Sequence, residues 1–194
     1  MDIKNFTCVG AGLIGQGWAT LFSSRGFPVV LQDVTEDILD GAVRRITSNL
    51  KFLEAKKVLK IGEANAALKR IKTTTQIAEA VVSVDYVQES VPDNYDLKKK
   101  IFEEIDALAP EHAILASSAS GLLMTEIQKV TTRPERCVLA HPMLPVHLIP
   151  LVEIVGGEQT SRETIETTRE AMKKLGKAPV LLNREVPGYI VNRL

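Results

Sequence analysis

Short runs of β-branched and other apolar residues alternate along the chain with longer stretches in which apolar residues recur every three or four positions. This alternation predicts strands joined by amphipathic helices, which is typical of an α/β protein with a mostly parallel sheet. The expected strands are residues 6–10, 29–33, 83–88, 113–117, 137–140, 151–155 and 179–182. The expected helices are residues 13–25, 35 to about 59, 96–108 and 161–175.

Residues at the ends of these segments are typical of helix caps. Thr35 is expected to cap the second helix, and Gly176 is expected to end the last one. Within that last helix the residues expected to face the core are Ile165, Thr168, Met172 and Leu175.

The composition argues against several classes of protein. The 194 residues contain 24 Lys plus Arg and 24 Asp plus Glu, so the formal net charge is zero, and 5% of the residues are aromatic. Such a chain lacks the basic and stacking surfaces that nucleic-acid binding requires. No apolar run approaches the ~20 residues that span a bilayer, and the N-terminus lacks a signal-peptide pattern. Cys8 and Cys137 lie in apolar runs, which predicts buried free thiols, no metal site and a cytoplasmic protein.

A glycine-rich turn follows the first predicted strand. Gly10, Gly12 and Gly15 form the pattern G-x-G-x-x-G and precede an apolar helix. In such a turn the first glycine allows the tight bend, the second lets the backbone approach a pyrophosphate, and the third lets the helix pack on the strand. The helix N-terminus at Leu13 and Ile14 then presents free N–H groups to the phosphates. The motif alone is weak, but its place between strand and helix predicts a dinucleotide site.

An acidic residue closes the second predicted strand. Asp33 lies 18 residues after Gly15, where its carboxylate can accept hydrogen bonds from an adenosine ribose. Val34 and Thr35 follow it, without an arginine that would bind a 2′-phosphate. The sequence therefore favours NAD over NADP.

A histidine and a glutamate interrupt two apolar strands. His141 ends one predicted strand, at the edge where open α/β sheets bind ligands, and Glu153 lies inside the next. A carboxylate in an apolar strand needs a partner, so the two residues can form an acid–base pair in which His141 exchanges the proton. Alternatively, Glu153 faces solvent and His141 merely ends a strand. The spacing alone leaves both interpretations open.

Taken together, these motifs resemble the NAD-binding domain of the 3-hydroxyacyl-CoA dehydrogenase family. The resemblance covers essentially the whole chain. It rests on the glycine turn, on Asp33 to Leu39, Ser117 to Ser120, His141-Pro142 and Leu151 to Glu153, and on Pro187 to Leu194. It implies a doubly wound, Rossmann-type sheet and an NAD-dependent oxidoreductase of fatty acid metabolism. The expected reaction is oxidation of the 3-hydroxyl of an L-3-hydroxyacyl-CoA to the 3-keto product.

The resemblance also implies roles for single residues. His141 matches the family's catalytic base and Glu153 its carboxylate partner. Ser120 matches a serine that binds the substrate oxygen, and Asn192 an asparagine at the mouth of the substrate pocket. The positions matched to cofactor binding, beyond the glycine turn and Asp33, are Ser118, Asp93 and Lys98, with the last two expected near the nicotinamide ribose. Glu89 is expected to be structural.

One position departs from the family pattern. The family has an asparagine three residues after the histidine, whereas Leu144 stands there in this chain. Leucine neither donates nor accepts a hydrogen bond, so we expect either reduced activity or a substrate other than the usual acyl group. His147 follows in a predicted loop and is interpreted as a surface residue, as is His112.

Two alternative functions stay open, and a third is disfavoured. The branches that act on small free hydroxy acids, of the L-gulonate and L-carnitine type, are similar to this chain in residues 87–92, 96–102 and 140–142. A non-catalytic NAD-binding protein, as in the λ-crystallin branch, is a second alternative. A dehydrogenase of the lysine-catalysed type is disfavoured, since His141 and Glu153 already fill the acid–base role.

The end of the sequence suggests a second domain. Residues 1–187 are expected to form the NAD-binding domain, and residues 188–194 to begin a helical domain whose remainder is absent. In the family that domain closes the substrate pocket and forms a homodimer. Without it, the apolar residues Tyr189, Ile190 and Val191 are expected to lack a cover.

Overall fold

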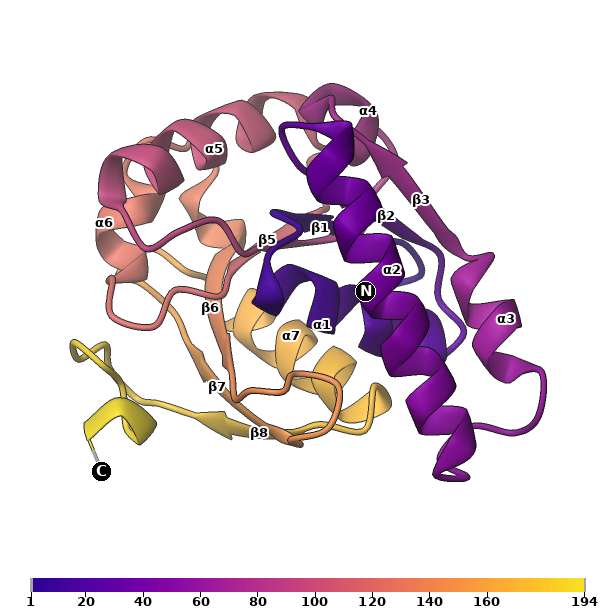
Figure 1. Ribbon diagram of the computed structural model, residues 1–194. Coiled ribbons are helices and arrows are strands. Elements are labelled where there is room, and N and C mark those ends of the chain that lie inside the picture. The colour runs from indigo at the N-terminus through magenta and orange to yellow at the C-terminus, as the bar shows by residue number, and fades with distance from the viewer. Residues whose placement is uncertain (1, 194) are drawn as a thin grey trace.

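The computed structural model describes residues 2–193 (Figure 1). Its strands are β1 (Phe6–Val9), β2 (Val29–Gln32), β3 (Ile71–Thr74), β4 (Tyr86–Glu89), β5 (Ile114–Ser117), β6 (Cys137–Pro142), β7 (Leu151–Val155) and β8 (Ala178–Leu181). Its helices are α1 (Leu13–Ser24), α2 (Glu36–Ala55), α3 (Glu63–Leu68), α4 (Ile77–Val81), α5 (Tyr95–Leu108), α6 (Met124–Gln128) and α7 (Arg162–Lys174). Single 3₁₀ turns cover Pro134–Arg136 and Val191–Arg193.

The strands form one sheet in the order β3-β2-β1-β4-β5-β6-β7-β8. All neighbouring pairs are parallel except β6 and β7, which run antiparallel. The order reverses at β1, where one half of the sheet leads to β2 and β3 and the other to β4. Open sheets of this kind bind ligands in the crevice at that reversal. The predicted doubly wound, mostly parallel sheet is therefore confirmed.

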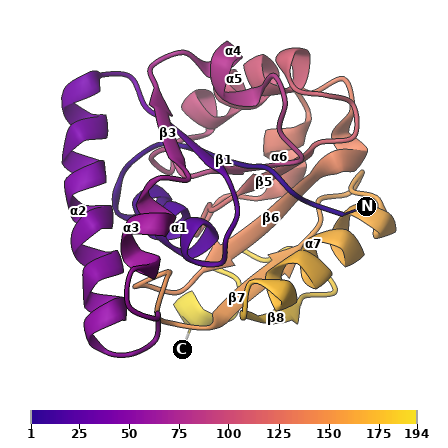
Figure 2. The ribbon, with the colours of Figure 1, turned by 90° about the vertical axis from the view of Figure 1, so that its right-hand side faces the viewer.

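Helices cover both faces of the sheet (Figures 1 and 2). On one face α1, α2, α3 and α7 pack on alternate strand residues such as Cys8, Leu31 and Ile154. On the other face α4, α5 and α6 pack on the residues in between, such as Val87 and Leu139. Strands buried on both faces must be apolar at nearly every position, which explains the continuous apolar runs in the sequence.

The predicted caps are present. Thr35 caps α2 by accepting a hydrogen bond from the Ile38 N–H, and Gly176 follows α7 with a φ of 81°. In α7, Thr168 and Met172 are buried as expected, as is Leu175 directly after the helix, and Ile165 is partly buried against the same core.

Some elements differ from the prediction. Helix α2 ends at Ala55 rather than near residue 59, because Lys57 takes a left-handed conformation with a φ of 61°. Strand β3 was not expected from the sequence Ile-Lys-Thr-Thr, since an edge strand with half-buried residues needs no apolar run. The short helices α3, α4 and α6 have only five or six residues each and give no clear helical period.

The cysteines Cys8 and Cys137 are both buried free thiols, as predicted. Burial raises the thiol pKa of Cys137 to about 12. Among the described residues, no helix is both long and apolar enough to cross a membrane.

Candidate active site

The glycine turn between β1 and α1 leaves the N-terminus of α1 uncapped by any side chain, as an anion-binding site requires. Gly10 has a φ of 93°, and a Cβ there would lie 2.9 Å from the Ser90 backbone. Gly15 packs so closely on the turn that a Cβ would overlap the Gly10 carbonyl oxygen. Gly12, by contrast, has open space where a Cβ would project and begins α1 without a side-chain cap. The N–H groups of the first turn of α1 therefore stay available for a phosphate.

A cavity of about 700 Å³ lies over this turn at the point where the strand order reverses. It is lined by seven of the residues predicted to bind the cofactor, by the serine predicted to bind the substrate, and by Leu144. These predicted residues are Gly10, Gly12, Leu13, Ile14, Asp33, Asp93, Ser118 and Ser120. The size, the open helix end and the acidic residues at the rim fit a dinucleotide.

Asp33 lies just beyond the end of β2 and is bound at both carboxylate oxygens. Its Oδ2 accepts from the Ala11 N–H at 2.6 Å, and its Oδ1 accepts from the Val34 N–H at 2.7 Å. Each oxygen keeps a second lone pair, so the fixed carboxylate can still accept from the two hydroxyls of a ribose. Val34 beside it is 75% exposed and offers no positive charge to a 2′-phosphate.

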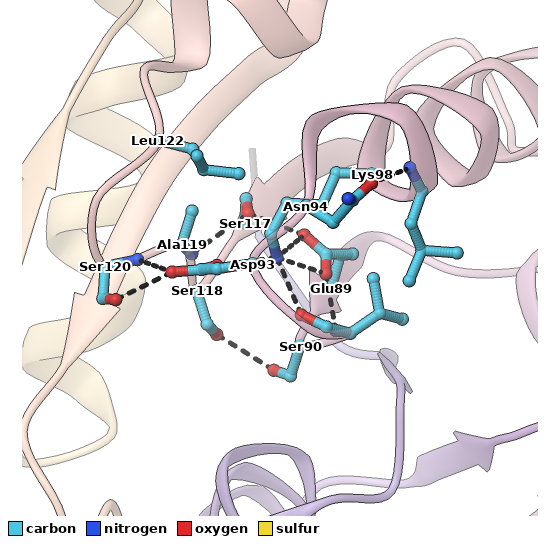
Figure 3. Close-up of polar contacts among 12 residues, drawn as sticks. Glu89, Ser90, Asp93, Asn94, Lys98, Ser117, Ser118, Ala119, Ser120 and Leu122 are labelled. Carbon is cyan, nitrogen blue, oxygen red and sulfur yellow. Dashed lines mark hydrogen bonds and ion pairs between the residues drawn. The ribbon is translucent and has the colours of Figure 1, made fainter.

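Asp93 and Ser120 face each other across the cavity rim (Figure 3). The Asp93 Oδ2 accepts from the Ser120 N–H at 2.9 Å and from the Ser120 hydroxyl at 2.7 Å. Burial opposes the ionisation of Asp93, but these hydrogen bonds and the charge of Lys98 outweigh it and lower the pKa of the carboxyl. The Ser120 proton is donated to Asp93 in this arrangement, so the Ser120 oxygen can only accept a further hydrogen bond until the hydroxyl turns away from Asp93.

Lys98 is held inside the protein rather than at the cavity surface. Its Nζ donates to both carboxylate oxygens of Glu89, at 2.8 and 3.0 Å, and to the Val91 carbonyl at 2.9 Å. Its Nζ also lies 3.4 Å from Asp93 Oδ1. Lys98 is fully buried and is not among the residues that line the cavity. A direct contact of Lys98 with the cofactor therefore stays a prediction, and the structure shows support of Asp93 instead.

Glu89 is the buried centre of this polar network. It is fully buried at the end of β4 and accepts from the Ser117 hydroxyl at 2.6 Å and the Val91 N–H at 2.6 Å. Burial raises the pKa of the Glu89 carboxyl, against the opposing effect of Lys98. Its contacts are with the protein itself, in agreement with the structural role expected from the sequence.

Ser118 joins the cavity floor to α1 and β4. Its hydroxyl contacts the Trp18 Nε1 at 3.1 Å, the Gln88 amide at 2.8 Å and the Ser90 hydroxyl at 3.0 Å. Figure 3 shows the Ser90 contact beneath Asp93. The serine therefore fixes α1 and β4 to the end of β5.

His141 and Glu153 are brought together by the antiparallel pairing of β6 and β7. They lie directly opposite each other in the register, and the His141 Nδ1 is 2.8 Å from the Glu153 Oε2. Both side chains are buried. A buried carboxylate beside Nδ1 favours the tautomer with the proton on Nδ1, which leaves Nε2 free to accept one.

The chain after β8 returns to this pair. Tyr189 is 1% exposed, and its ring lies 5.6 Å from the His141 ring, centroid to centroid. The Asn192 amide donates to the Ser120 carbonyl at 3.1 Å. All four predicted catalytic residues are thereby connected, since the same short segment contacts Ser120 at one end and the His141–Glu153 pair at the other. The expectation that Tyr189 lacks a cover is wrong, because its ring is buried against the sheet; Ile190 is 48% exposed.

Two other histidines do not join the site. His112 is exposed and contacts Asp85 at 3.2 Å. His147 is half-buried in the β6–β7 loop rather than fully at the surface, and burial lowers its pKa. It lines a second cavity of about 550 Å³ between α1, α2 and this loop, and Leu144 lies on the wall of both cavities.

The fold and the cavity define a dinucleotide-binding α/β domain, and comparison with known proteins identifies its family. The family profile described as "3-hydroxyacyl-CoA dehydrogenase, NAD binding domain" matches residues 5–186. The chain belongs to this family, which confirms the resemblance and NAD as the cofactor of the domain. It is 40% identical over 187 residues to lambda-crystallin of Oryctolagus cuniculus, covering 96% of this chain and 59% of that protein. It is 41% identical over 193 residues to an L-carnitine dehydrogenase of Pseudomonas putida, covering 100% and 59%.

Solved structures agree with this assignment. A (S)-3-hydroxybutyryl-CoA dehydrogenase from Ralstonia eutropha superposes with a TM-score of 0.94 at 35% identity, covering 100% of this chain and 68% of that one. A diketoreductase superposes with a TM-score of 0.95 at 31% identity, covering 100% and 69%. The chain thus spans 59% of the length of each of the two sequence relatives named above.

One set of contacts at the site was not expected from the sequence. The backbone N–H groups of Ile190 and Val191 point at Glu153, and the Tyr189 ring at His141. Every residue except proline has a backbone N–H, so the residue type does not show which N–H groups will bind Glu153. The only available signal was Pro187-Gly188, which indicates a turn at this place but not what the turn faces.

Proposed function

We propose that this domain serves an NAD-dependent dehydrogenase that oxidises the 3-hydroxyl of an L-3-hydroxyacyl-CoA, or of a related 3-hydroxy acid, to the 3-keto product. The observation that carries the proposal is the buried contact of 2.8 Å between His141 Nδ1 and Glu153 Oε2. A domain that only binds a dinucleotide has no need of a buried acid–base pair at the same edge of the sheet.

The residues divide the chemistry between them. NAD, when bound, supplies the acceptor for the hydride that leaves the carbinol carbon. His141 takes the hydroxyl proton at Nε2, while the Glu153 carboxylate stabilises the imidazolium that forms. Ser120 donates its hydroxyl proton to the substrate oxygen, for which the hydroxyl turns away from Asp93 Oδ2. The contact of the Ser120 N–H with Asp93 keeps the residue in place meanwhile. Asn192 lies beside Ser120, where its amide donates to the Ser120 carbonyl.

The test is the formation of NADH by the full-length protein. Hydroxyacyl-CoAs of several chain lengths, L-gulonate and L-carnitine are each supplied with NAD, and absorbance of NADH is followed for wild type and His141→Gln. We expect turnover with at least one substrate and a loss of at least about 100-fold in kcat in the variant. NAD binding without turnover of any of these substrates would instead favour the non-catalytic alternative.

A small free hydroxy acid is the second candidate substrate. Two observations favour it: the 41% identity to an L-carnitine dehydrogenase, and Leu144 where the family has an asparagine. Leu144→Asn restores a hydrogen-bonding side chain on the cavity wall. If a hydroxyacyl-CoA is the natural substrate, this change should leave or raise its kcat/KM. If a small acid is the substrate, kcat/KM for that acid should fall by about 10-fold.

We also propose the helical second domain, the homodimer and the cytoplasmic location that the resemblance implies. Light scattering of the full-length protein gives its mass in solution. A monomer in solution would contradict the proposed homodimer.

A further inference from the structure

We propose that the segment Pro187–Asn192 is a positioning element for the acid–base pair, with Tyr189 as its anchor. The inference rests on the proposed function and adds to it, since it concerns what keeps Glu153 in its active geometry. It starts from the two oxygens of the Glu153 carboxylate. Oε2 contacts His141, and Oε1 accepts from the Ile190 N–H at 2.9 Å and the Val191 N–H at 3.2 Å.

These two N–H groups provide hydrogen bonds to the Glu153 carboxylate that the sheet itself does not provide. Glu153 is 1% exposed inside a strand of apolar residues, where water cannot solvate the charge. One imidazole satisfies one oxygen only, and a carboxylate with a free oxygen can rotate about its terminal bond. With Oε1 fixed by two N–H donors, Oε2 is held toward His141 Nδ1. The segment therefore both satisfies the charge and sets the direction of the carboxylate.

The backbone conformation of the segment makes this contact possible. Gly188 and Tyr189 are both left-handed, with φ of 78° and 49°. Two consecutive left-handed residues reverse the chain, so that the next two N–H groups point back at β7. A tyrosine is rarely left-handed, and such a conformation persists only where surrounding contacts hold it.

Tyr189 provides those contacts. Its ring is buried in the apolar cluster beneath α5 and α6, and its hydroxyl donates to the Leu122 carbonyl. The ring also lies against His141, so the same side chain that fixes the turn restrains the imidazole. A separate contact holds the segment upstream, where Glu185 accepts from the backbone of Met124 and Thr125 at the start of α6.

The consequence is that the pair depends on a stretch of chain outside the sheet. Any movement of residues 188–191 away from β7 frees Glu153 Oε1 and removes the packing on His141. Tyr189 touches no reacting atom in this arrangement and acts through Glu153 and His141. It is therefore a positioning residue.

The test compares Tyr189→Ala with Tyr189→Phe and Val58→Ala in the full-length protein. Tyr189→Ala removes the anchor, Tyr189→Phe keeps the ring, and Val58→Ala truncates an exposed apolar side chain that belongs neither to the segment nor to the lining of the cofactor cavity. We expect Tyr189→Ala to lower kcat at least about 10-fold and to move the acid limb of the pH–rate profile toward that of Glu153→Gln. Tyr189→Phe should keep both values near those of wild type, Val58→Ala should change neither, and the Kd for NAD should stay constant in all three.

Two measurements are independent of turnover. Imidazole ¹⁵N NMR reports whether the His141 proton stays on Nδ1, and we expect a mixture of tautomers in Tyr189→Ala only. Amide hydrogen exchange reports the other contact: Ile190 and Val191 should exchange slowly in wild type and at least about 10-fold faster in Glu153→Ala. If Tyr189→Ala does not fold, Tyr189→Leu, which keeps apolar bulk without a ring, takes its place.

The outcomes separate the two proposals. A wild-type protein without turnover, but with slow exchange and the Nδ1 tautomer, would overturn the proposed function and support the positioning role. An active Tyr189→Ala with an unchanged pH profile and tautomer would overturn the positioning role. In that case lowered stability alone would identify Tyr189 as an ordinary core residue.

Discussion

His141 and Glu153 are twelve residues apart in the sequence and stand opposite each other on two antiparallel strands. The β6–β7 pair is the single antiparallel ladder among the described strands of the sheet. A parallel crossover would need a helix between the strands, which would leave the two residues much further apart in the sequence. The hairpin thus places the proposed base and its carboxylate partner at one edge of the sheet with a loop of eight residues, 143–150.

Glu153→Gln keeps the shape of the side chain and removes its charge. We expect kcat for alcohol oxidation to fall at least about 10-fold, because the amide stabilises a protonated imidazole less well. For the same reason the acid limb of the kcat profile should move to lower pH. The Kd for NAD should not change, since Glu153 does not line the cofactor cavity. An unaltered pH profile would separate Glu153 from the chemistry.

Asp33→Ala removes the acceptor from the end of β2. Calorimetry should show NADH binding weakened by about 10-fold or more, because one charge-assisted hydrogen bond is worth ~1.5–3 kcal/mol. NADPH binding should change far less, so the preference for NADH should shrink. The matched control is Thr35→Ser, which keeps the cap of α2 and should leave both affinities as they are. Equal losses for NADH and NADPH would remove Asp33 from the ribose site.

Lys98→Met leaves Glu89 buried without its counter-charge. We expect the free energy of unfolding to fall by ~3–5 kcal/mol, the range for breaking one partner of a buried ion pair. The double variant Lys98→Met with Glu89→Gln should recover at least half of that loss, because it no longer buries a charge. Urea unfolding of wild type and the two variants measures both effects. A loss of less than about 1 kcal/mol in the single variant would show that Glu89 is neutral in the fold.

The sequence predicted what depends on residue type. Gly10 and Gly15 are required by close approaches that only glycine permits, and Asp33 stands at the end of an apolar strand. Such features follow from local sterics and hydrophobic pattern, and so the sheet and its cofactor edge could be predicted. The edge strand β3 could not be predicted, because it is half-exposed and its residues show no alternation of apolar and polar positions.

The burial of some side chains depends on where the fold places them and not on the residue type. Lys98 lies in a run of three lysines on α5, and nothing in that run shows which one is buried. Only the position of Glu89 at the end of β4 selects it. The covering of Tyr189 was likewise not predicted, because the turn at Gly188 sends the ring back onto the sheet. These contacts arise from long-range packing.

Lys177 provides a test of stability against pH. Its side chain is buried under the β6–β7 loop, where Nζ donates to the Val146 and Ile149 carbonyls and lies 5.2 Å from the centre of the Trp18 ring. Desolvation lowers the pKa of Lys177 from 10.5 to about 8. The group contacts no carboxylate in these hydrogen bonds, so its buried charge is a cost to the folded state below that pH.

The sign of the effect follows from proton linkage. Below about pH 8 the lysine is charged in both states, and the folded state bears the burial cost. Between about pH 8 and 10.5 the folded lysine is neutral while the unfolded one still binds a proton, so this group makes the protein more stable as pH rises. The difference between these pKa values corresponds to at most ~3 kcal/mol. The buried thiols and tyrosines act in the opposite direction, because burial raises the pKa of Cys8 and Tyr86.

Lys177→Met separates the two contributions, since the thiols and tyrosines are the same in both proteins. The free energies of unfolding of wild type and Lys177→Met are measured in urea at steps from about pH 7 to 10.5. The wild-type value minus the variant value should rise across the window from about 8 to 10.5, by ~1–3 kcal/mol, as the buried amine loses its charge. Lys177→Arg is the control, because a guanidinium keeps its charge throughout this range and should give no such rise. A constant difference between wild type and Lys177→Met would show that Lys177 stays protonated beneath the loop, held by the two carbonyls and the Trp18 ring.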